Sequence, residues 1–213
     1  MSTPHPWPMK LTREQKRTSK QRAIDFKSAL KSCIRGTRWR VSRGTLFRQE
    51  GEWFVDVLPL LLWERGVSIR LTIKPMSLDP LFWNIVGLNG TRTLPLSFRA
   101  NGAWVLRPPY TQDFISADEV NVEQLASDVL AWCNTEAKRR INLSSMHSII
   151  NQLPSNKITR SNFFAVEVCL YILIGDLSAA ADLCMPSDPI THLPFETVEV
   201  ILFQGKTGAG QRL

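Results

Sequence analysis

The clearest hydrophobic pattern in the chain has a period of two. In the segment VSIRLTIK, residues 67–74, apolar and polar residues alternate without a break: Val67, Ile69, Leu71 and Ile73 against Ser68, Arg70, Thr72 and Lys74. This alternation predicts a strand with one buried and one exposed face. The preceding run, WFVDVLPLLLW, is mostly apolar, and its Pro59 indicates a strand at a sheet edge or at a bulge. We expect its one carboxylate, Asp56, to face solvent.

Turn-forming residues divide this extended region into strands. Residues 38–48 read as extended and are broken at Gly44, and Glu50-Gly51 forms a turn. Asn101-Gly102, within LPLSFRANGAWVLR, predicts a hairpin with a type I′ turn. Asp79 and Pro80 suit the N-cap and first position of a short helix. Together these signals predict an antiparallel sheet of about four to five strands.

Helical periodicity surrounds this region. Apolar residues step by three and four from about Glu14 to Arg35, which predicts an amphipathic helix before the sheet. After it, Asn121 and Gln124 resemble a capping box that opens a long helix. The segment 163–174 is apolar nearly all round and predicts a central buried helix, closed by Gly175.

These elements define the fold class and the organisation of the chain. A helix, then an antiparallel sheet, then a helical C-terminal half indicate an α+β protein. We divide the chain into a mobile arm at 1–12, a helix with the sheet at 13–118 and a helical region packed on that sheet at 119–213. We expect the two larger parts to form one continuous domain.

Composition narrows the cellular setting. The chain has 213 residues, of which 44% are hydrophobic, and no run of eighteen apolar residues. We therefore expect no membrane association. The four cysteines stand far apart and form no CxxC pair: Cys33, Cys133, Cys169 and Cys184. This spacing indicates a cytoplasmic protein without disulfides or zinc.

Positive charge is concentrated at the N-terminal end. Residues 1–50 hold 13 Lys and Arg against 3 Asp and Glu, a net charge of +10, whereas residues 51–213 carry −3. The segment RGTRWRVSRGTLFRQEGEWF adds four aromatic residues to five of these arginines. It is either the solvated face of a hairpin or an anion-binding surface with exposed rings. The candidate binding residues are Lys16, Arg17, Lys20, Arg38, Trp39, Arg40, Arg43, Phe47 and Arg48.

Catalytic and cofactor signals are absent. GKTGAG lacks the earlier glycine of a phosphate loop, because Val200 occupies that position. The three histidines are isolated, there is no GxSxG motif, and the acidic residue and lysine triplets of a nuclease fall in helical segments. We predict no enzymatic activity, no catalytic residue, no metal and no cofactor.

The stretch FKSALKSCIRGTRWRVSRGTLFRQEGEWFVDVLPLLL resembles bacterial proteins of the domain-of-unknown-function 4304 family. In those proteins a helix is followed by an aromatic, basic and glycine-containing segment and then a strand. The residues that carry the resemblance are Trp39, Arg40, Arg43, Gly44, Phe47 and Arg48. The resemblance covers about half of the chain and implies an α+β fold with no established activity.

These observations predict a non-enzymatic cytoplasmic protein that acts through a protein–protein surface, as an accessory or inhibitory subunit of a bacterial system. The alternative is a nucleic-acid-binding module that contacts DNA or RNA through residues 10–48. The sequence leaves the partner and the oligomeric state open.

Overall fold

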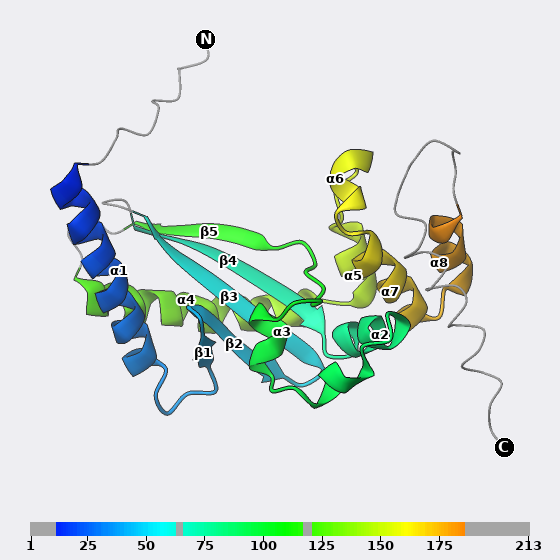
Figure 1. The fold of residues 1–213 in the computed structure, drawn as a ribbon, viewed down its shortest axis with the longest axis horizontal. Coiled ribbons are helices and arrows are strands. Elements are labelled where there is room, and N and C mark those ends of the chain that lie inside the picture. Colours follow the sequence, from blue (N-terminus) through cyan, green and yellow to red (C-terminus); the bar gives the residue numbers. More distant parts are fainter. Residues whose placement is uncertain (1–11, 63–65, 117–120, 186–213) are drawn as a thin grey trace, which may run out of the picture.

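The computed structural model describes residues 12–62, 66–116 and 121–185. It confirms the α+β class, with an N-terminal helix, a five-stranded antiparallel sheet and helices in the C-terminal half (Figure 1). The elements in chain order are α1 (Arg13–Cys33), β1 (Arg40–Ser42), β2 (Thr45–Glu50), β3 (Trp53–Leu62), β4 (Gly66–Pro75), α2 (Leu78–Ile85), η1 (Asn89–Thr93), α3 (Ser97–Asn101), β5 (Thr111–Ser116), α4 (Val122–Leu143), α5 (Met146–Asn151), α6 (Lys157–Ser161), α7 (Phe164–Ile174) and α8 (Leu177–Cys184).

The strands lie in the order β1-β2-β3-β4-β5, and every neighbouring pair is antiparallel. Strand β3 pairs with β4 along its whole length, but it pairs with β2 only from Trp53 to Val57. Pro59 therefore lies beyond the end of β2, where β3 is an edge on that side. The missing N–H of proline interrupts no hydrogen bonding to β2 there, so the edge-strand interpretation of Pro59 is confirmed.

The hairpin predicted at Asn101-Gly102 is wrong. Asn101 is the last residue of α3, and its side-chain amide binds the β1–β2 region, accepting from Thr45 Oγ1 at 3.0 Å and donating to the Ser42 carbonyl at 2.8 Å. Gly102 has a φ of −71°, and a Cβ there would lie 2.5 Å from the Phe98 carbonyl oxygen. Glycine is required for this close approach and not for a left-handed turn.

The left-handed turn of the sheet lies instead between β1 and β2. Arg43 and Gly44 have φ values of 50° and 86°, as both central residues of a type I′ turn require. The sequence-based prediction placed only a break at Gly44. Strand β5 was also missed, because its six residues follow two prolines and alternate only weakly.

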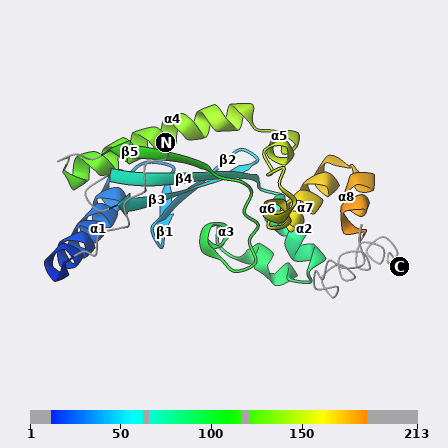
Figure 2. The same ribbon diagram turned by 90° about the horizontal axis from the view of Figure 1, so that it is seen from above.

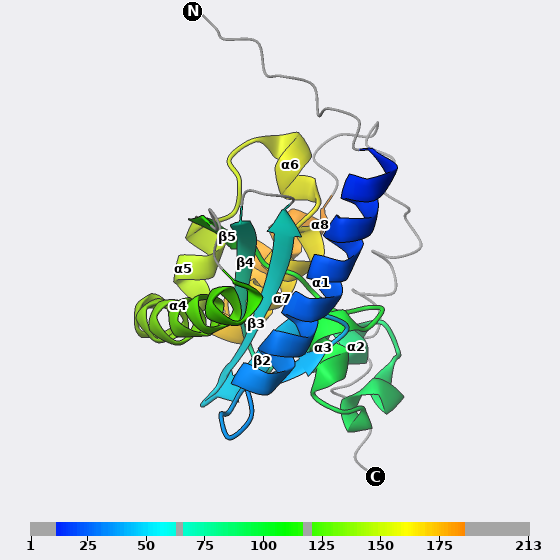
Figure 3. The same cartoon turned by 90° about the vertical axis from the view of Figure 1, so that its left-hand side faces the viewer.

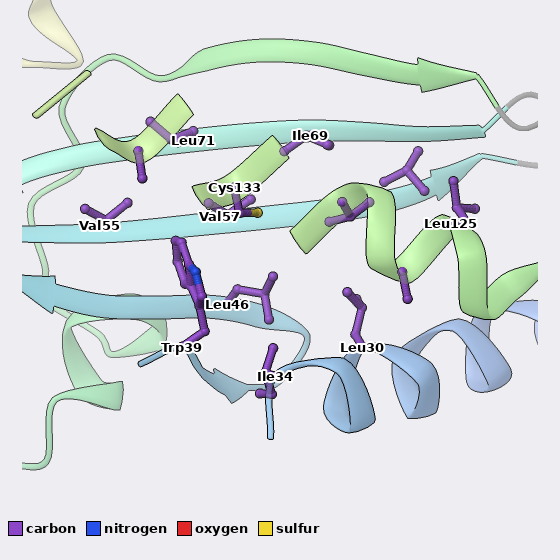
Figure 4. Packing of buried hydrophobic residues seen from close by; sticks show 14 of the residues in the cluster. Leu30, Ile34, Trp39, Leu46, Val55, Val57, Ile69, Leu71, Leu125 and Cys133 are labelled. Atoms are coloured by element: carbon purple, nitrogen blue, oxygen red, sulfur yellow. The ribbon is translucent and has the colours of Figure 1, made fainter. Parts of the chain in front are cut away.

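The main core lies between one face of the sheet and helices α1 and α4, with α4 running along the sheet (Figure 2). The buried face predicted for β4 is confirmed, because Val67, Ile69, Leu71 and Ile73 all pack there. The exposed face is not confirmed, because Ser68 and Lys74 on the other side are buried too. Figure 4 shows Leu30 of α1, Val57 of β3 and Cys133 of α4 among the side chains of this cluster. The N-cap of α4 is Asn121, as predicted, and its side chain accepts from the Gln124 N–H.

A second apolar cluster joins α2, α5 and α7. Helix α7 is buried from Val166 to Leu170, whereas its last residues are only partly buried, so it is less enclosed than predicted. Gly175 ends it with a φ of 85°, as predicted, and the Asp176 side chain caps α8 by accepting from the Ala179 N–H at 3.0 Å.

The two ends of the chain fall largely outside the described residues. Residues 1–11 and 186–213, which include most of the predicted arm and Val200, lie there. Thr12 is the N-cap of α1 and forms a capping box with Gln15, so the helix begins at Arg13. Among the described helices, none is long and apolar enough to cross a membrane.

All four cysteines are free thiols. Cys133 and Cys169 are buried, and burial raises the pKa of each thiol to about 12. A thiol that stays protonated is a poor nucleophile, so these two cysteines act as small apolar core residues.

Candidate functional site

Four lysines form a straight stripe along α1. Lys16, Lys20, Lys27 and Lys31 are spaced by four, seven and four residues, and all four are exposed. With 3.6 residues per helical turn, this spacing keeps them within about 60° of arc on the helix surface. The stripe is about 22 Å long, since each residue advances the helix by about 1.5 Å. We call these four residues the lysine stripe.

The carboxylates of α1 lie on a different side of the helix. Glu14 and Asp25 stand about 100° of arc or more from every member of the lysine stripe. Asp25 accepts a hydrogen bond from the Gln21 amide at 2.9 Å, and within the described part of the chain no salt bridge involves α1. Helices commonly place opposite charges three or four residues apart. On α1 the carboxylates stand three residues from Arg17 and Arg22, and none stands three or four residues from a stripe lysine. The stripe is therefore left uncompensated within the helix.

The N-terminal half of α1 stands clear of the core. None of residues 13–25 is buried, whereas Phe26, Ala29 and Leu30 of the following turns are. The dark-blue end of the helix extends past the strands in Figures 1 and 3. Lys16, Arg17 and Lys20 are therefore accessible from several directions.

The hairpin arginines adjoin the middle of the lysine stripe. The Lys27 Cε atom lies 3.8 Å from the position that a Cβ would take on Gly44, in the β1–β2 turn. Arg40 and Arg43 are exposed beside this turn, and Arg38 is exposed with an ion pair to Glu50 at 3.3 Å. The stripe and the hairpin thus form one basic surface, which narrows to the single helix α1 toward Lys16.

Three of the nine predicted binding residues are buried and do not reach this surface: Trp39, Phe47 and Arg48. Trp39 packs in the main core, and Phe47 stacks on Phe54 beneath α3 with ring centroids 6.2 Å apart. Neither ring is available to stack on a base. The other six are exposed on the basic surface, which also includes Lys27 and Lys31. Sequence reasoning could have found both from the four-seven-four spacing.

Arg48 serves the packing of the sheet on α4. Its guanidinium lies 4.6 Å from the centre of the Trp39 ring, and Asn134 Oδ1 accepts from both Trp39 Nε1 at 2.9 Å and Arg48 Nη1 at 3.2 Å. Burial lowers the pKa of Arg48, and the Glu50 carboxylate, 3.3 Å from Nε, opposes that shift. One amide oxygen of Asn134 therefore holds both the indole and the guanidinium.

The second face of the sheet carries a buried ion network beside α3. Lys74 Nζ donates to Asp79 Oδ1 at 3.0 Å and to the carbonyls of Leu106 and Arg99 at 2.8 and 3.2 Å. Two predictions are therefore wrong: Lys74 does not face solvent, and Asp79 does not cap α2, whose N-cap is Ser77. All three ammonium hydrogens are used within the chain, which indicates a structural role.

Asp56 lies on the same face and is also buried, contrary to the expectation that it faces solvent. Burial raises its pKa to about 6, and the nearby charges of Lys74 and Arg107 oppose this shift. Perturbed carboxyl groups often mark catalytic sites. Its neighbours in register across the sheet are Phe47 and Thr72, and the charged groups that act on it are Lys74, Arg107 and Asp79.

Two further features complete the description. A hollow of about 290 Å³ lies between α1 and the start of α4, lined by Asp25, Ser28, Ala29, Ser32, Cys33 and Glu123. This volume is at the lower limit for small-molecule sites. Across residues 12–62, 66–116 and 121–185, no group of three or more His, Cys, Asp or Glu is placed to hold a metal ion.

Comparisons with known proteins found no match: no family model, curated protein or solved structure is similar to this chain. The resemblance to the 4304 family therefore stays a prediction.

Proposed function

We propose that this protein is a cofactor-free binding protein whose partner is a protein that presents carboxylates to the lysine stripe. The observation that carries the proposal is the separation of the lysine stripe from both carboxylates of α1, with four exposed lysines on one side and the carboxylates on another. Acidic residues with the same four- and seven-residue spacing on a partner helix would face these lysines one by one. We place the protein in the cytoplasm, as an accessory or inhibitory subunit of a bacterial system.

Nucleic acid is the alternative partner for this surface, and the burial of Trp39 and Phe47 disfavours it. Single strands are held by aromatic rings interleaved with cations, and the basic surface retains only the cations. A duplex partner would use phosphate contacts alone. With about five phosphates neutralised, log affinity would fall against log salt with a slope of roughly −4 to −5.

Zero-length crosslinking tests the proposal directly. A water-soluble carbodiimide joins a lysine amine to a carboxylate in contact with it, so treatment of the tagged full chain in a lysate of the source cell should link Lys20 and Lys27 to Asp or Glu of one partner. Mass spectrometry of the linked peptides identifies both sides. The Lys20→Glu/Lys27→Glu variant should lose the partner.

A matched control separates this surface from net charge. Arg92→Glu/Lys138→Glu changes the charge of the protein by the same amount at exposed positions outside α1 and the β1–β2 hairpin, and it should retain the partner. Capture that the α1 variant does not weaken contradicts the proposal. Capture that disappears after nuclease treatment, with the salt slope given above, replaces it with the nucleic-acid alternative.

A further inference from the structure

Part of the second face of the sheet presents exposed aromatic rings beside a partly buried arginine. The strand register places Leu60, Ser68 and Phe114 opposite one another, and the next row holds Leu58, Arg70 and Gln112. Phe114 is 47% exposed, and Tyr110, just before β5, is 50% exposed. Figure 1 looks onto this face, with α3 at its lower end and the ribbons of β4 and β5 uncovered above it.

Arg70 connects the two rows to Tyr110. Its guanidinium lies 5.0 Å from the centre of the Tyr110 ring, and its Nε is buried without a hydrogen-bond partner. Among the described residues, no salt bridge engages Arg70. An arginine that is stacked on a ring and lacks a counterion within the chain is placed to receive an anion from outside.

Among the described residues of these rows, the cations outnumber the carboxylates. Arg40, which lies opposite Phe47 in the register, is on the same face as Arg70 and is exposed. The carboxylate of these rows is Asp56, which is buried and lies near the positive charges of Lys74 and Arg107. These charges offset that of Asp56, so it repels an anionic ligand only weakly.

The edge of the sheet beside this face is blocked at Phe114. Asp113 Oδ1 accepts the Phe114 N–H at 2.7 Å, and Asp113 Oδ2 accepts from Trp132 Nε1 on α4 at 2.7 Å. The backbone donor that an incoming strand would use at Phe114 is already occupied, which disfavours pairing at this point of the edge. We therefore consider the face of the sheet as the surface that a ligand would contact.

We propose that Leu60, Arg70, Tyr110, Gln112 and Phe114 form a second binding surface, the ring surface, which takes single-stranded nucleic acid. Bases stack on Tyr110 and Phe114, and a backbone phosphate meets Arg70. The Gln112 amide, which donates to Ser68 Oγ at 3.3 Å, is exposed and able to bond a base edge. This surface is separate from the lysine stripe and goes beyond the proposed function.

The test is fluorescence anisotropy of the full chain with a labelled twelve-nucleotide oligo(U) and its oligo(dT) counterpart. Tyr110→Leu/Phe114→Leu keeps apolar bulk and removes both rings, so it should weaken binding by roughly tenfold or more. Trp104→Leu removes an exposed ring that does not belong to the ring surface and should leave the affinity unchanged. Arg70→Gln should make the slope of log affinity against log salt shallower by about 0.7.

Three outcomes overturn the proposal. The first is binding by the double leucine variant as tight as that of the wild type. The second is a loss of binding for Lys20→Glu/Lys27→Glu alone, which would assign the single strand to the lysine stripe. The third is a failure of the wild type to bind either oligonucleotide. If self-association or capture of a protein then depends on Leu60 and Phe114, the ring surface is a protein contact. Ultraviolet crosslinking to peptide 110–116 gives an independent check, because it needs no variant.

Discussion

Lys74 and Asp79 form an ion pair in the interior, with Lys74 Nζ 2.9 Å from Asp79 Oδ2 and side chains that are 1% and 0% exposed. The pair joins the end of β4 to the first turn of α2. Asp79 also accepts the Leu106 N–H at 3.0 Å, and Arg99 lies 3.5 Å from its second oxygen. Burial lowers the pKa of Lys74, and the Asp79 carboxylate opposes that shift. The charged state of Lys74 is therefore supported by the Asp79 carboxylate.

Breaking this pair from one side should be strongly destabilising. Asp79→Asn leaves a buried ammonium without its counterion, and we expect the free energy of unfolding to fall by about 3–5 kcal/mol. Urea denaturation followed by circular dichroism measures the loss. Asp25→Asn, on the exposed side of α1, is the control and should change stability by less than about 0.5 kcal/mol.

The double variant Lys74→Met/Asp79→Asn decides whether the charges are coupled. Removing the ammonium together with the carboxylate eliminates the unpaired ion, so the double variant should be more stable than Asp79→Asn alone. Losses that add, with the double variant the least stable of the set, would contradict the coupling.

Lys74 also shows which part of the fold could not be predicted from the sequence. Alternation within β4 identified the four core residues correctly, because one face of a half-buried strand is a local property. It could not reveal that the segment 99–106 lies over the other face at Lys74. The same limit applies at Asn101-Gly102, where local turn preference predicted a hairpin. Asn101 instead ends helix α3 and binds Ser42 and Thr45, which are more than fifty residues away in the sequence.

Asp56 should make stability depend on pH. Its folded pKa of about 6 lies above the ordinary value for Asp, so the folded state retains a proton that the unfolded chain releases. Stability contributed by this group is therefore lost as pH rises from about 4 to 6. Asp56→Asn should match the wild type near pH 4 and exceed it by up to roughly 3 kcal/mol above pH 7. Urea unfolding at pH 4, 5, 6 and 7.5 gives the difference, and one that is constant across this range would contradict the prediction.

Asn134 should be sensitive to the loss of its side-chain oxygen and tolerant of a negative charge introduced at the same position. Asn134→Leu removes the acceptor of both Trp39 Nε1 and Arg48 Nη1, and we expect a loss of about 2–4 kcal/mol, since two buried donors are left unpaired. Asn134→Asp keeps an acceptor at the same position and places a negative charge beside Arg48, so it should retain most of the stability. Thermal unfolding of the two variants compares them, and equal losses would show that the oxygen is not what matters.

Asp113 should keep the protein from associating through β5. Asp113→Ala frees the Phe114 N–H and leaves Trp132 Nε1 without its acceptor. Because an open edge strand is a template for pairing, we expect this variant to form oligomers as its concentration rises. Most substitutions of exposed residues would not change the oligomeric state. Light scattering after size exclusion detects them. Asp128→Ala on α4 is the control, and monodisperse behaviour of both variants would contradict a protective role for Asp113.

The sequence predicted the positive charge of the candidate site, but it did not predict which aromatic side chains are buried and which are exposed. The excess of cations before residue 50 follows from composition alone, and six of the nine candidates are exposed. Trp39 and Phe47 could not be assigned to the interior from a segment of mixed aromatic and basic residues, because arginine stems and rings suit either side of a strand. The exposed rings of Tyr110 and Phe114 were missed because they follow from β5, which local alternation did not reveal.

The lack of buried side chains in the N-terminal half of α1 affects how this helix would bind a partner. Since residues 13–25 bury no side chain, those turns are able to unwind and re-form while the core around Phe26 and Leu30 stays intact. Their amide hydrogens should exchange with solvent far sooner than those of α4. Part of the association energy would then go into winding these turns, so the contact would be readily reversible and its strength would follow helix propensity as well as charge.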